Sequence, residues 1–400
     1  MRLEHVAVTP GGSPGTVRLT GTVTYETGTP SREDYWYEVP DMCRDGLSTS
    51  GNPWLVALLP LAMTIGEPLH VSLPVDEALL GRCRRVMEIW AAWYPDLQRI
   101  PIETPVGHGE GWSPERTGLF YSGGVDSFFS LLRHQNPDPA GYHTTIDDLI
   151  LIWGADIPLD QPEAFARMRQ RYGVLAAEMG KTLVHVATNL RETRWNTTAW
   201  ANLSHGAFLA SVGLSLERRY RRLLVASSIP ISHSMGGWGS HPMVDPLFST
   251  DATEIVYDAM AETRDQKVEA LVHSELALTH LRVCWRSGTD RNCGECIKCL
   301  RTMIALEIHG GLEACTTFPD AHLDLAKVAR IYAGKSGNFR LFRRLSATAW
   351  LHGRMDIVRA LDRALGRSIR LGTLISMLEA YGGPGSWRAR EFLLRNSIHQ

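Results

Sequence analysis

Two short stretches of the sequence combine residue types and spacings that could do chemistry, and the first lies between a strand-like and a helix-like segment. It consists of Ser122, Gly123, Gly124, Val125, Asp126 and Ser127. The apolar run 119–121 precedes it, and Phe and Leu recur at helical spacing over 128–132. A glycine turn lets a ligand approach the main chain, and the free N–H groups of a first helical turn form an anion site. The stretch therefore predicts a phosphate-binding loop, with a plain Ser/Gly turn as the alternative.

The second stretch contains four closely spaced cysteines: Cys284, Cys293, Cys296 and Cys299. The spacing C-x8-C-x2-C-x2-C can present four thiolates to one tetrahedral ion, and four sulfurs close a structural zinc site. An iron–sulfur cluster usually carries a different spacing, and a redox pair needs only two cysteines, so these uses are the alternatives. The remaining cysteines are typical of buried thiols: Cys43, Cys83 and Cys315. The sequence therefore predicts one Zn²⁺ ion per chain.

The elements around the first stretch indicate a sheet that would position it. Strand-like runs alternate with helical patterns at 161–179 and 203–220; the runs are 119–121, 148–153, 182–186 and 223–226. Such alternation is typical of a doubly wound parallel sheet, whose ligands bind at the carboxyl ends of the strands. We therefore expect three residues that follow strands to share one rim with the glycine loop: Asp156, Asn189 and Ser228. Each of them could instead be an ordinary turn residue.

Three further residues are candidates for contact with a substrate: His205, His241 and Asp245. His205 precedes a glycine at a predicted helix start, where a polar side chain also commonly caps the helix. The other two lie in the glycine-rich stretch 232–250. Irregular stretches of that length inside a compact domain are usually functional or disordered. This one is predicted to be a lid over a substrate, with a solvated loop as the alternative.

The chain divides into three predicted parts joined by a linker at 106–116. Residues 1–105 contain short β-rich runs and two helical patterns, which predict an α+β domain. Residues 117–310 form the predicted α/β domain, with the cysteine stretch at 284–299. Residues 320–400 predict helices rich in arginine; such a face is usually solvated, and could instead dock an acidic carrier or a nucleic acid.

Composition narrows the class of protein. The chain has 400 residues, of which 44% are hydrophobic and 21% charged, as in ordinary globular proteins. A net charge of −2 gives no general reason to expect nucleic-acid or membrane binding. No apolar run is long enough to cross a bilayer, and the N-terminus lacks a signal-peptide core. Clustered cysteines favour a metal site in a reducing compartment. We therefore expect a cytoplasmic protein without a membrane partner.

The glycine loop resembles the SGGxDS pyrophosphate loop of the N-type ATP pyrophosphatases, which include GMP, asparagine and NAD synthetases. Together with the cysteine cluster, it gives the chain a resemblance to the 7-cyano-7-deazaguanine synthases over about residues 117–310. Their C-G-x-C-x-x-C-x-x-R pattern is matched at 293–301, and Lys267 stands where that family has a lysine. Segments 202–206 and 241–245 replace the family's P-G-R-N run and Y-P-D-C-R loop, which contact substrate. The resemblance thus implies an adenine nucleotide alpha hydrolase-like fold with ATP and zinc, but not the deazaguanine substrate.

The resemblance also implies a reaction, that of an AMP-forming C–N ligase. A carboxylate or amide oxygen of a small molecule or peptide would attack the α-phosphate of ATP. Pyrophosphate would leave into the glycine loop, with Mg²⁺ stabilising the developing charge. Ammonia or an amine would then displace AMP, giving an amide or a nitrile. The implied catalytic residues are Ser122, Asp126, Ser127 and Lys267. Two alternatives stay open: an enzyme that thiolates tRNA or a small molecule, and a non-enzymatic nucleotide-binding regulator. The sequence does not determine the oligomeric state, and a homodimer is one possibility.

Overall fold

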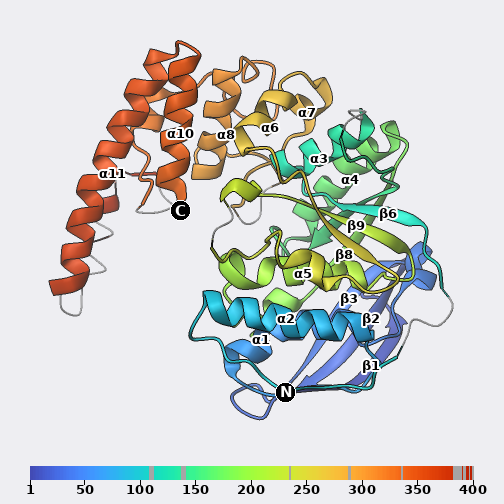
Figure 1. Cartoon of the computed structure of the whole chain (residues 1–400). Helices are drawn as coiled ribbons and strands as arrows, with labels where there is room; N and C mark the ends of the chain where they lie inside the picture. The colour runs from blue at the N-terminus through green and yellow to red at the C-terminus, as the bar shows by residue number, and fades with distance from the viewer. Residues whose placement is uncertain are drawn as a thin grey trace. The chain divides into compact units, whose positions relative to one another are not determined.

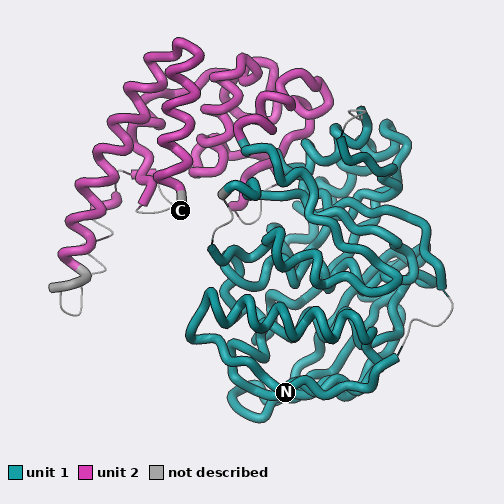
Figure 2. The backbone as a smooth tube through the Cα atoms, in the orientation of Figure 1, with its two compact units in different colours: residues 1–264 teal, residues 265–400 magenta. Residues whose placement is uncertain are grey.

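The computed structural model describes most of the chain: residues 1–107, 112–136, 141–233, 236–286, 290–334, 337–381, 390, 393–395 and 397–398. The chain forms two compact units, Met1–Arg264 and Asp265–Gln400, coloured teal and magenta in Figure 2. The first unit contains a large sheet with helices, and the described part of the second unit is built mainly from helices.

A ten-stranded sheet runs through the first unit, in the order β10-β9-β6-β7-β8-β3-β2-β1-β4-β5 (Figure 1). Five neighbouring strands are parallel: β6 (Arg116–Phe120), β7 (Asp148–Trp153), β8 (Thr182–Thr188), β9 (Tyr220–Ala226) and β10 (Glu254–Asp258). The other five are β1 (Arg2–Pro10), β2 (Thr16–Thr24), β3 (Arg32–Pro40), β4 (Leu69–Val71) and β5 (Ile102–Glu103). Of these, β1, β2 and β3 are joined by antiparallel pairing. The predicted α/β class is confirmed as a mixed, mostly parallel sheet.

Helices connect the strands of the first unit: α1 (Asn52–Ile65), α2 (Glu77–Trp93), α3 (Val125–Gln135), α4 (Pro162–Glu178) and α5 (His205–Leu214). Their limits follow local chemistry; Asp76, for example, accepts a hydrogen bond from the N–H of Leu79 at 2.8 Å and so caps α2. The helix predicted over 203–220 is shorter, because a π-helical turn at Trp200–Ser204 precedes α5 and turns follow it.

The N-terminal segment, which we predicted to be a domain of its own, instead extends the same sheet. Strand β3 pairs antiparallel with β8, with Tyr37 opposite Thr188. Helix α1 is buried on all sides, since 12 of its 14 residues are inaccessible, and it packs on α5. A helix that is apolar all round must lie inside a core. Residues 1–105 and the strands that follow therefore share one hydrophobic core.

The second unit contains the remaining helices: α7 (Glu275–His280), α8 (Ile297–Ile308), α9 (Leu325–Ala329), α10 (Gly337–Leu351), α11 (Met355–Tyr381) and α6 (Arg264–Leu271), which begins at the boundary. Helices α9, α10 and α11 lie within 320–400, the segment predicted to be helical. The cysteine stretch falls in this unit, whereas we had predicted it inside the α/β domain. Among the described residues, no helix combines the length and apolarity needed to span a membrane.

Asp148, the first residue of β7, forms buried ion pairs with two arginines, and its contribution to the stability of the fold can be measured. The Asp148 carboxylate is inaccessible and accepts hydrogen bonds from Arg219 at 2.8 Å and from Arg116 at 3.1 Å. Burial alone would raise the pKa of Asp148, but these two arginines hold it below its usual value. We expect Asp148→Asn to lower the free energy of unfolding by about 3 kcal/mol, because it leaves the guanidinium groups without their counter-charge.

Urea denaturation would measure this loss, and a matched substitution provides the control. Glu254 pairs with Arg222 at 2.8 Å, but its side chain is 55% exposed. Exposed pairs contribute little, so Glu254→Gln should cost less than about 1 kcal/mol. Equal losses for the two variants would contradict the role assigned to Asp148.

Candidate functional site

The glycine loop follows β6 and leads directly into α3. Gly123 has φ +73°, in the left-handed region that favours glycine. A Cβ built on Gly123 would lie 1.7 Å from the hydroxyl oxygen of Tyr172, so no other residue fits there. The Tyr172 hydroxyl also donates to the Ser122 carbonyl at 3.5 Å. The tight turn is therefore fixed both by its own backbone and by the α4 tyrosine beneath it.

Hydroxyl groups gather at the N-terminus of α3. The Ser122 and Ser127 hydroxyl oxygens lie 3.4 Å apart, and the Gly124 N–H donates to the Ser122 hydroxyl at 3.3 Å. The Ser127 hydroxyl donates to the Gly124 carbonyl at 3.1 Å. No side chain of the described chain caps α3. The turn thus combines the positive end of a helix dipole with two hydroxyls, which are the donors that an anion requires.

The loop lies where the strand order of the sheet reverses. Strand β6 is flanked by β7 on one side and by β9 on the other, with β10 beyond β9. In open α/β sheets, ligands bind in the crevice outside the carboxyl ends of the strands at such a reversal. Three segments leave the sheet there: the glycine loop after β6, Ser227–Ser228 after β9, and the segment 259–264 after β10.

Sequence reasoning missed one charged residue at this edge. Arg264, the first residue of α6, forms an ion pair with Asp126 in the first turn of α3. The two residues are 138 positions apart in the chain. The only signal in the sequence was that Arg264 follows a further strand, β10, which ends at the same edge as β6.

The predicted rim residues follow the expected strands but have different surroundings. Asn189 follows β8; its side-chain oxygen accepts from the N–H of Trp36 at 2.9 Å, and its amide donates to the carbonyl of Asp34 at 2.8 Å. These bonds fasten β3 to the end of β8, and the predicted nucleotide contact of Asn189 stays a prediction. Ser228 follows β9 and accepts from the Trp238 indole at 3.3 Å.

Asp156 is an exposed residue beyond the end of β7. Its carboxylate acts on the guanidinium of Arg191, since its charge partly offsets the lowering of the Arg191 pKa by burial. Asp156 is therefore accessible beyond the carboxyl end of β7, and its predicted nucleotide contact stays a prediction.

In the predicted lid, the residues around His241 and Asp245 are buried, whereas Gly236, Trp238 and Met243 are exposed; residues 234–235 lie outside the described chain. His241 is 1% exposed and lies against Trp93, with 4.6 Å between the ring centroids. Asp245 accepts from the Ser240 hydroxyl at 2.6 Å and from the His241 N–H at 3.0 Å. A Cβ on Gly206 would lie 2.2 Å from the Asp245 carboxylate. Asp245 thus lies against the start of α5, whose first residue is His205, while the ring of His205 lies against Trp200 with 4.8 Å between the centroids. His241 and Asp245 hold the loop from inside.

Burial gives Asp245 an unusual ionisation. Removal from water is the largest influence and raises the pKa of Asp245 to about 7, against the hydrogen bonds from Ser240 and His241. Since the pKa is raised on folding, protonation stabilises the folded state. This contribution is full below the ordinary aspartate pKa and is lost as the pH rises through 7.

We therefore expect wild-type protein to lose stability relative to Asp245→Asn, which cannot ionise, as the pH rises from 5 to 8. The relative loss should be roughly 2 kcal/mol, because each unit of pKa shift corresponds to about 1.4 kcal/mol. Urea denaturation at the two pH values measures this difference. A difference between the two proteins that does not change with pH would contradict an ionisable Asp245 in the folded interior.

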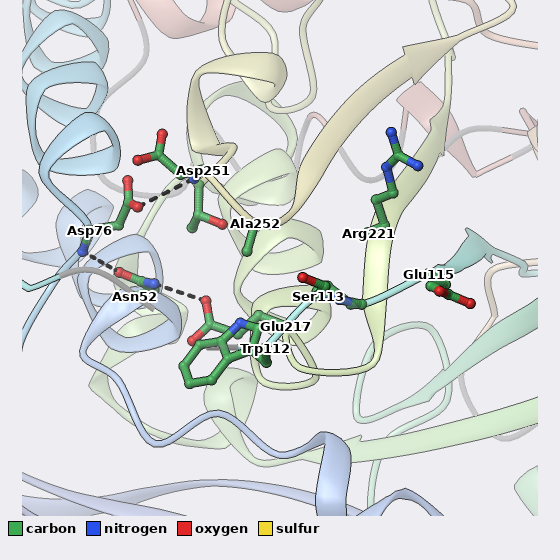
Figure 3. Close-up of a pocket in the computed structure, with 11 residues that line it drawn as sticks. Asn52, Asp76, Trp112, Ser113, Glu115, Glu217, Arg221, Asp251 and Ala252 are labelled. Atoms are coloured by element: carbon green, nitrogen blue, oxygen red, sulfur yellow. Dashed lines mark hydrogen bonds between the residues drawn. The ribbon is translucent and has the colours of Figure 1, made fainter. Parts of the chain in front are cut away.

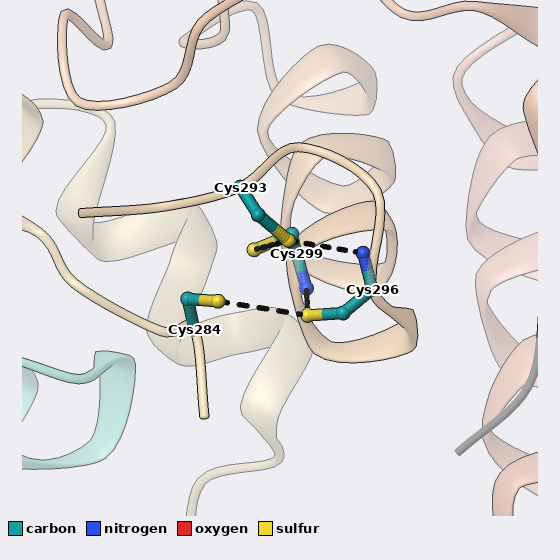
Figure 4. Close-up of side chains that lie close together, drawn as sticks. All are labelled: Cys284, Cys293, Cys296 and Cys299. Atoms are coloured by element: carbon teal, nitrogen blue, oxygen red, sulfur yellow. Dashed lines mark hydrogen bonds between the residues drawn. The ribbon is translucent and has the colours of Figure 1, made fainter. Parts of the chain in front are cut away.

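The four predicted metal ligands come together in the second unit (Figure 4). Their sulfur atoms all lie within 4.8 Å of one another. Cys284 follows α7, Cys293 and Cys296 lie in the turn before α8, and Cys299 is in the first turn of α8. The N–H of Cys296 donates to the Cys293 sulfur at 3.2 Å, and the N–H of Cys299 to the Cys296 sulfur at 3.4 Å. Such donors stabilise thiolates, so the cluster could hold a tetrahedral metal ion such as zinc.

Four sulfur ligands would leave no position for a substrate, so the expected role of the metal is structural. We expect about one zinc ion per chain and expect Cys296→Ser to lose it, with a large fall in melting temperature, because binding energy at such sites is folding energy. Elemental analysis and thermal melting measure these two effects. Cys315, which is buried but outside the cluster, supplies the control: Cys315→Ala should retain the zinc. Iron in the purified protein, or no metal, would contradict the zinc assignment.

A polar cavity of about 500 Å³ lies at the opposite edge of the sheet, near the amino ends of β6, β9 and β10 (Figure 3). In Figure 3, Asn52 bridges the main chain of Asp76 and the carboxylate of Glu217, through two hydrogen bonds of 2.8 Å each. Glu217 also accepts from the Ser48 and Ser50 hydroxyls at 2.6 Å. These buried groups already have partners, so they join the N-terminal segment to the turn before β9.

Lys267, the remaining predicted catalytic residue, lies in α6 and is 1% exposed. It belongs to the second unit, so its implied role at the glycine loop stays a prediction.

Comparison with protein-family models, curated proteins and solved structures found no match.

Proposed function

We propose that this protein is an ATP-dependent, AMP-forming ligase of the N-type ATP pyrophosphatase kind. The observation that carries the proposal is the glycine loop between β6 and α3. It combines a left-handed Gly123, an uncapped helix N-terminus and the Ser122 and Ser127 hydroxyls, at the carboxyl edge where the strand order reverses. This set of donors suits the β- and γ-phosphates of a nucleotide.

The loop residues would act mainly on the leaving pyrophosphate. Main-chain N–H groups and the two hydroxyls would donate to its oxygens as negative charge develops, which is where such sites gain most of their rate. Asp126 supplies a carboxylate, the ligand type that Mg²⁺ prefers. When bound, Mg²⁺ would neutralise phosphate charge and orient the triphosphate. Oxygen of a carboxylate or amide would attack the α-phosphate, and ammonia or an amine would then displace AMP.

Nitrogen transfer is favoured over sulfur transfer by the state of the nearest thiols. The first unit contains two cysteines, Cys43 and Cys83, and both are buried. Burial raises the pKa of each thiol above its usual value. A sulfur carrier needs an accessible thiolate, which these surroundings oppose. We therefore propose a small-molecule or peptide acceptor in the cytoplasm, and keep thiolation of tRNA or a small molecule as the second candidate.

Exchange of labelled pyrophosphate into ATP, with a pool of candidate acceptors, would test the proposal, because it requires a reversible adenylation. Ser122→Ala and Asp126→Ala should each lower the rate of exchange by a factor of about 10²–10³, which is the usual cost of losing one stabilising contact in a transition state. Ser113→Ala, at the opposite edge of the sheet, should leave exchange unchanged.

Two results would reject this function. One is ADP and phosphate as the products, since these come from cleavage at the γ-phosphate. The other is near-normal exchange in both loop variants while their melting temperatures match that of the parent.

A further inference from the structure

The ion pair between Arg264 and Asp126 brings a positively charged side chain to the glycine loop, whose own residues, 122–127, include no lysine or arginine. Both side chains are partly accessible, 19% for Arg264 and 18% for Asp126, so a ligand can reach them. Asp126 lies in the first turn of α3, where its negative charge would repel an incoming phosphate. The guanidinium of Arg264 offsets that charge at the mouth of the loop.

The segment that carries Arg264 is held in a fixed and strained path. Ala259, directly after β10, has φ +56°, the one positive φ among the described residues other than glycine. Its carbonyl accepts a hydrogen bond from the Ser227 hydroxyl, and the Ser227 N–H donates to the carbonyl of Asp258 at 2.8 Å. The Ile231 N–H donates to the Met260 carbonyl at 2.8 Å. Strain of this kind persists only where surrounding contacts impose it, and it concentrates at functional sites.

A second arginine, Arg133, lies beside the acidic residues near Arg264. Arg264 is therefore not needed as their counter-charge. Arg133, near the other end of α3, lies 3.7 Å from Asp258 and 3.8 Å from Glu262. Asp258 and Glu262 thus have a cationic neighbour other than Arg264, and His134 also lies 3.1 Å from Asp258. Arg264 instead extends to the glycine loop, where its planar group could bind two phosphate oxygens at once.

We propose that Arg264 is a phosphate-binding residue that Asp126 holds ready in the ligand-free protein. When the pyrophosphate portion of ATP occupies the glycine loop, the guanidinium passes from the Asp126 carboxylate to the phosphate oxygens. This frees Asp126, the carboxylate suited to Mg²⁺. The inference rests on the proposed function, because it takes pyrophosphate as the ligand of the loop.

A double-mutant cycle with pyrophosphate as the probe tests this exchange. Isothermal titration calorimetry without Mg²⁺ would compare the parent, Arg264→Gln, Asp126→Asn and the double variant. Loss of a charge-assisted, two-point contact should weaken binding by about 10- to 100-fold in Arg264→Gln. Asp126→Asn should bind at least as tightly as the parent, since it removes a repelling charge. The double variant should remain about tenfold or more weaker than Asp126→Asn.

The same experiment separates direct binding from simple neutralisation. If Arg264 only neutralises Asp126, the double variant will bind as tightly as Asp126→Asn, and the proposal is overturned. Arg264→Lys, which keeps the charge but not the planar fork, should give an intermediate affinity. Arg133→Gln, the matched arginine control, should bind pyrophosphate like the parent. Melting temperatures of all the variants verify that each is folded.

The outcomes also distinguish this inference from the proposed function. A parent protein that exchanges pyrophosphate into ATP, together with an Arg264→Gln variant of unchanged affinity, would overturn the role of Arg264 alone. A parent that binds no pyrophosphate would overturn both.

Discussion

The pairing of β3 with β8 is the contact on which the architecture of the first unit depends. It involves only two residue pairs, Tyr37 with Thr188 and Glu38 with Ala187. The Asn189 carboxamide continues it, taking the place of a strand residue against the β3 backbone. Because this ladder is short, burial must supply most of the stability, and α1 does so by packing on α5. Without this junction, the parallel sheet would end at β8 with an exposed edge.

This junction also explains why the candidate site lies toward the other side of the sheet. Strand β8 becomes an interior strand, and the residue that follows it is used to hold β3. The polar groups that remain at the carboxyl edge follow β6, β7, β9 and β10. The strand order reverses between β6 and β9, and in open α/β sheets the crevice at such a reversal is where ligands bind.

The sequence predicted those features whose signal is local. The glycine loop and the four cysteines are recognisable because a few adjacent residues carry both the turn and the chemistry. The parallel strands are recognisable because buried runs such as 148–153 are continuously apolar. Features that depend on residues far apart could not be found in this way. The hydrogen bond between Asn189 and Trp36 joins residues 153 positions apart. In the sequence, a polar residue that follows a strand looks the same whether it binds a ligand or holds a neighbouring strand. Similarly, nothing within residues 1–105 indicates that β3 will find β8 as its partner.

The two polar edges of the sheet differ in how deeply their charged groups are buried, and therefore in how easily those groups can change partners. At the amino edge, Glu217 is 1% exposed and accepts hydrogen bonds from three side chains, so moving any one of them would remove a hydrogen bond from a buried carboxyl group that water cannot replace. At the carboxyl edge, Asp126 and Arg264 are about one-fifth exposed. Water can solvate each group while a ligand displaces the other, which keeps the cost of separating them low. The proposed transfer of Arg264 from Asp126 to a phosphate requires an ion pair of this second kind, and the strained backbone at Ala259 helps to fix the path of the segment that carries the arginine.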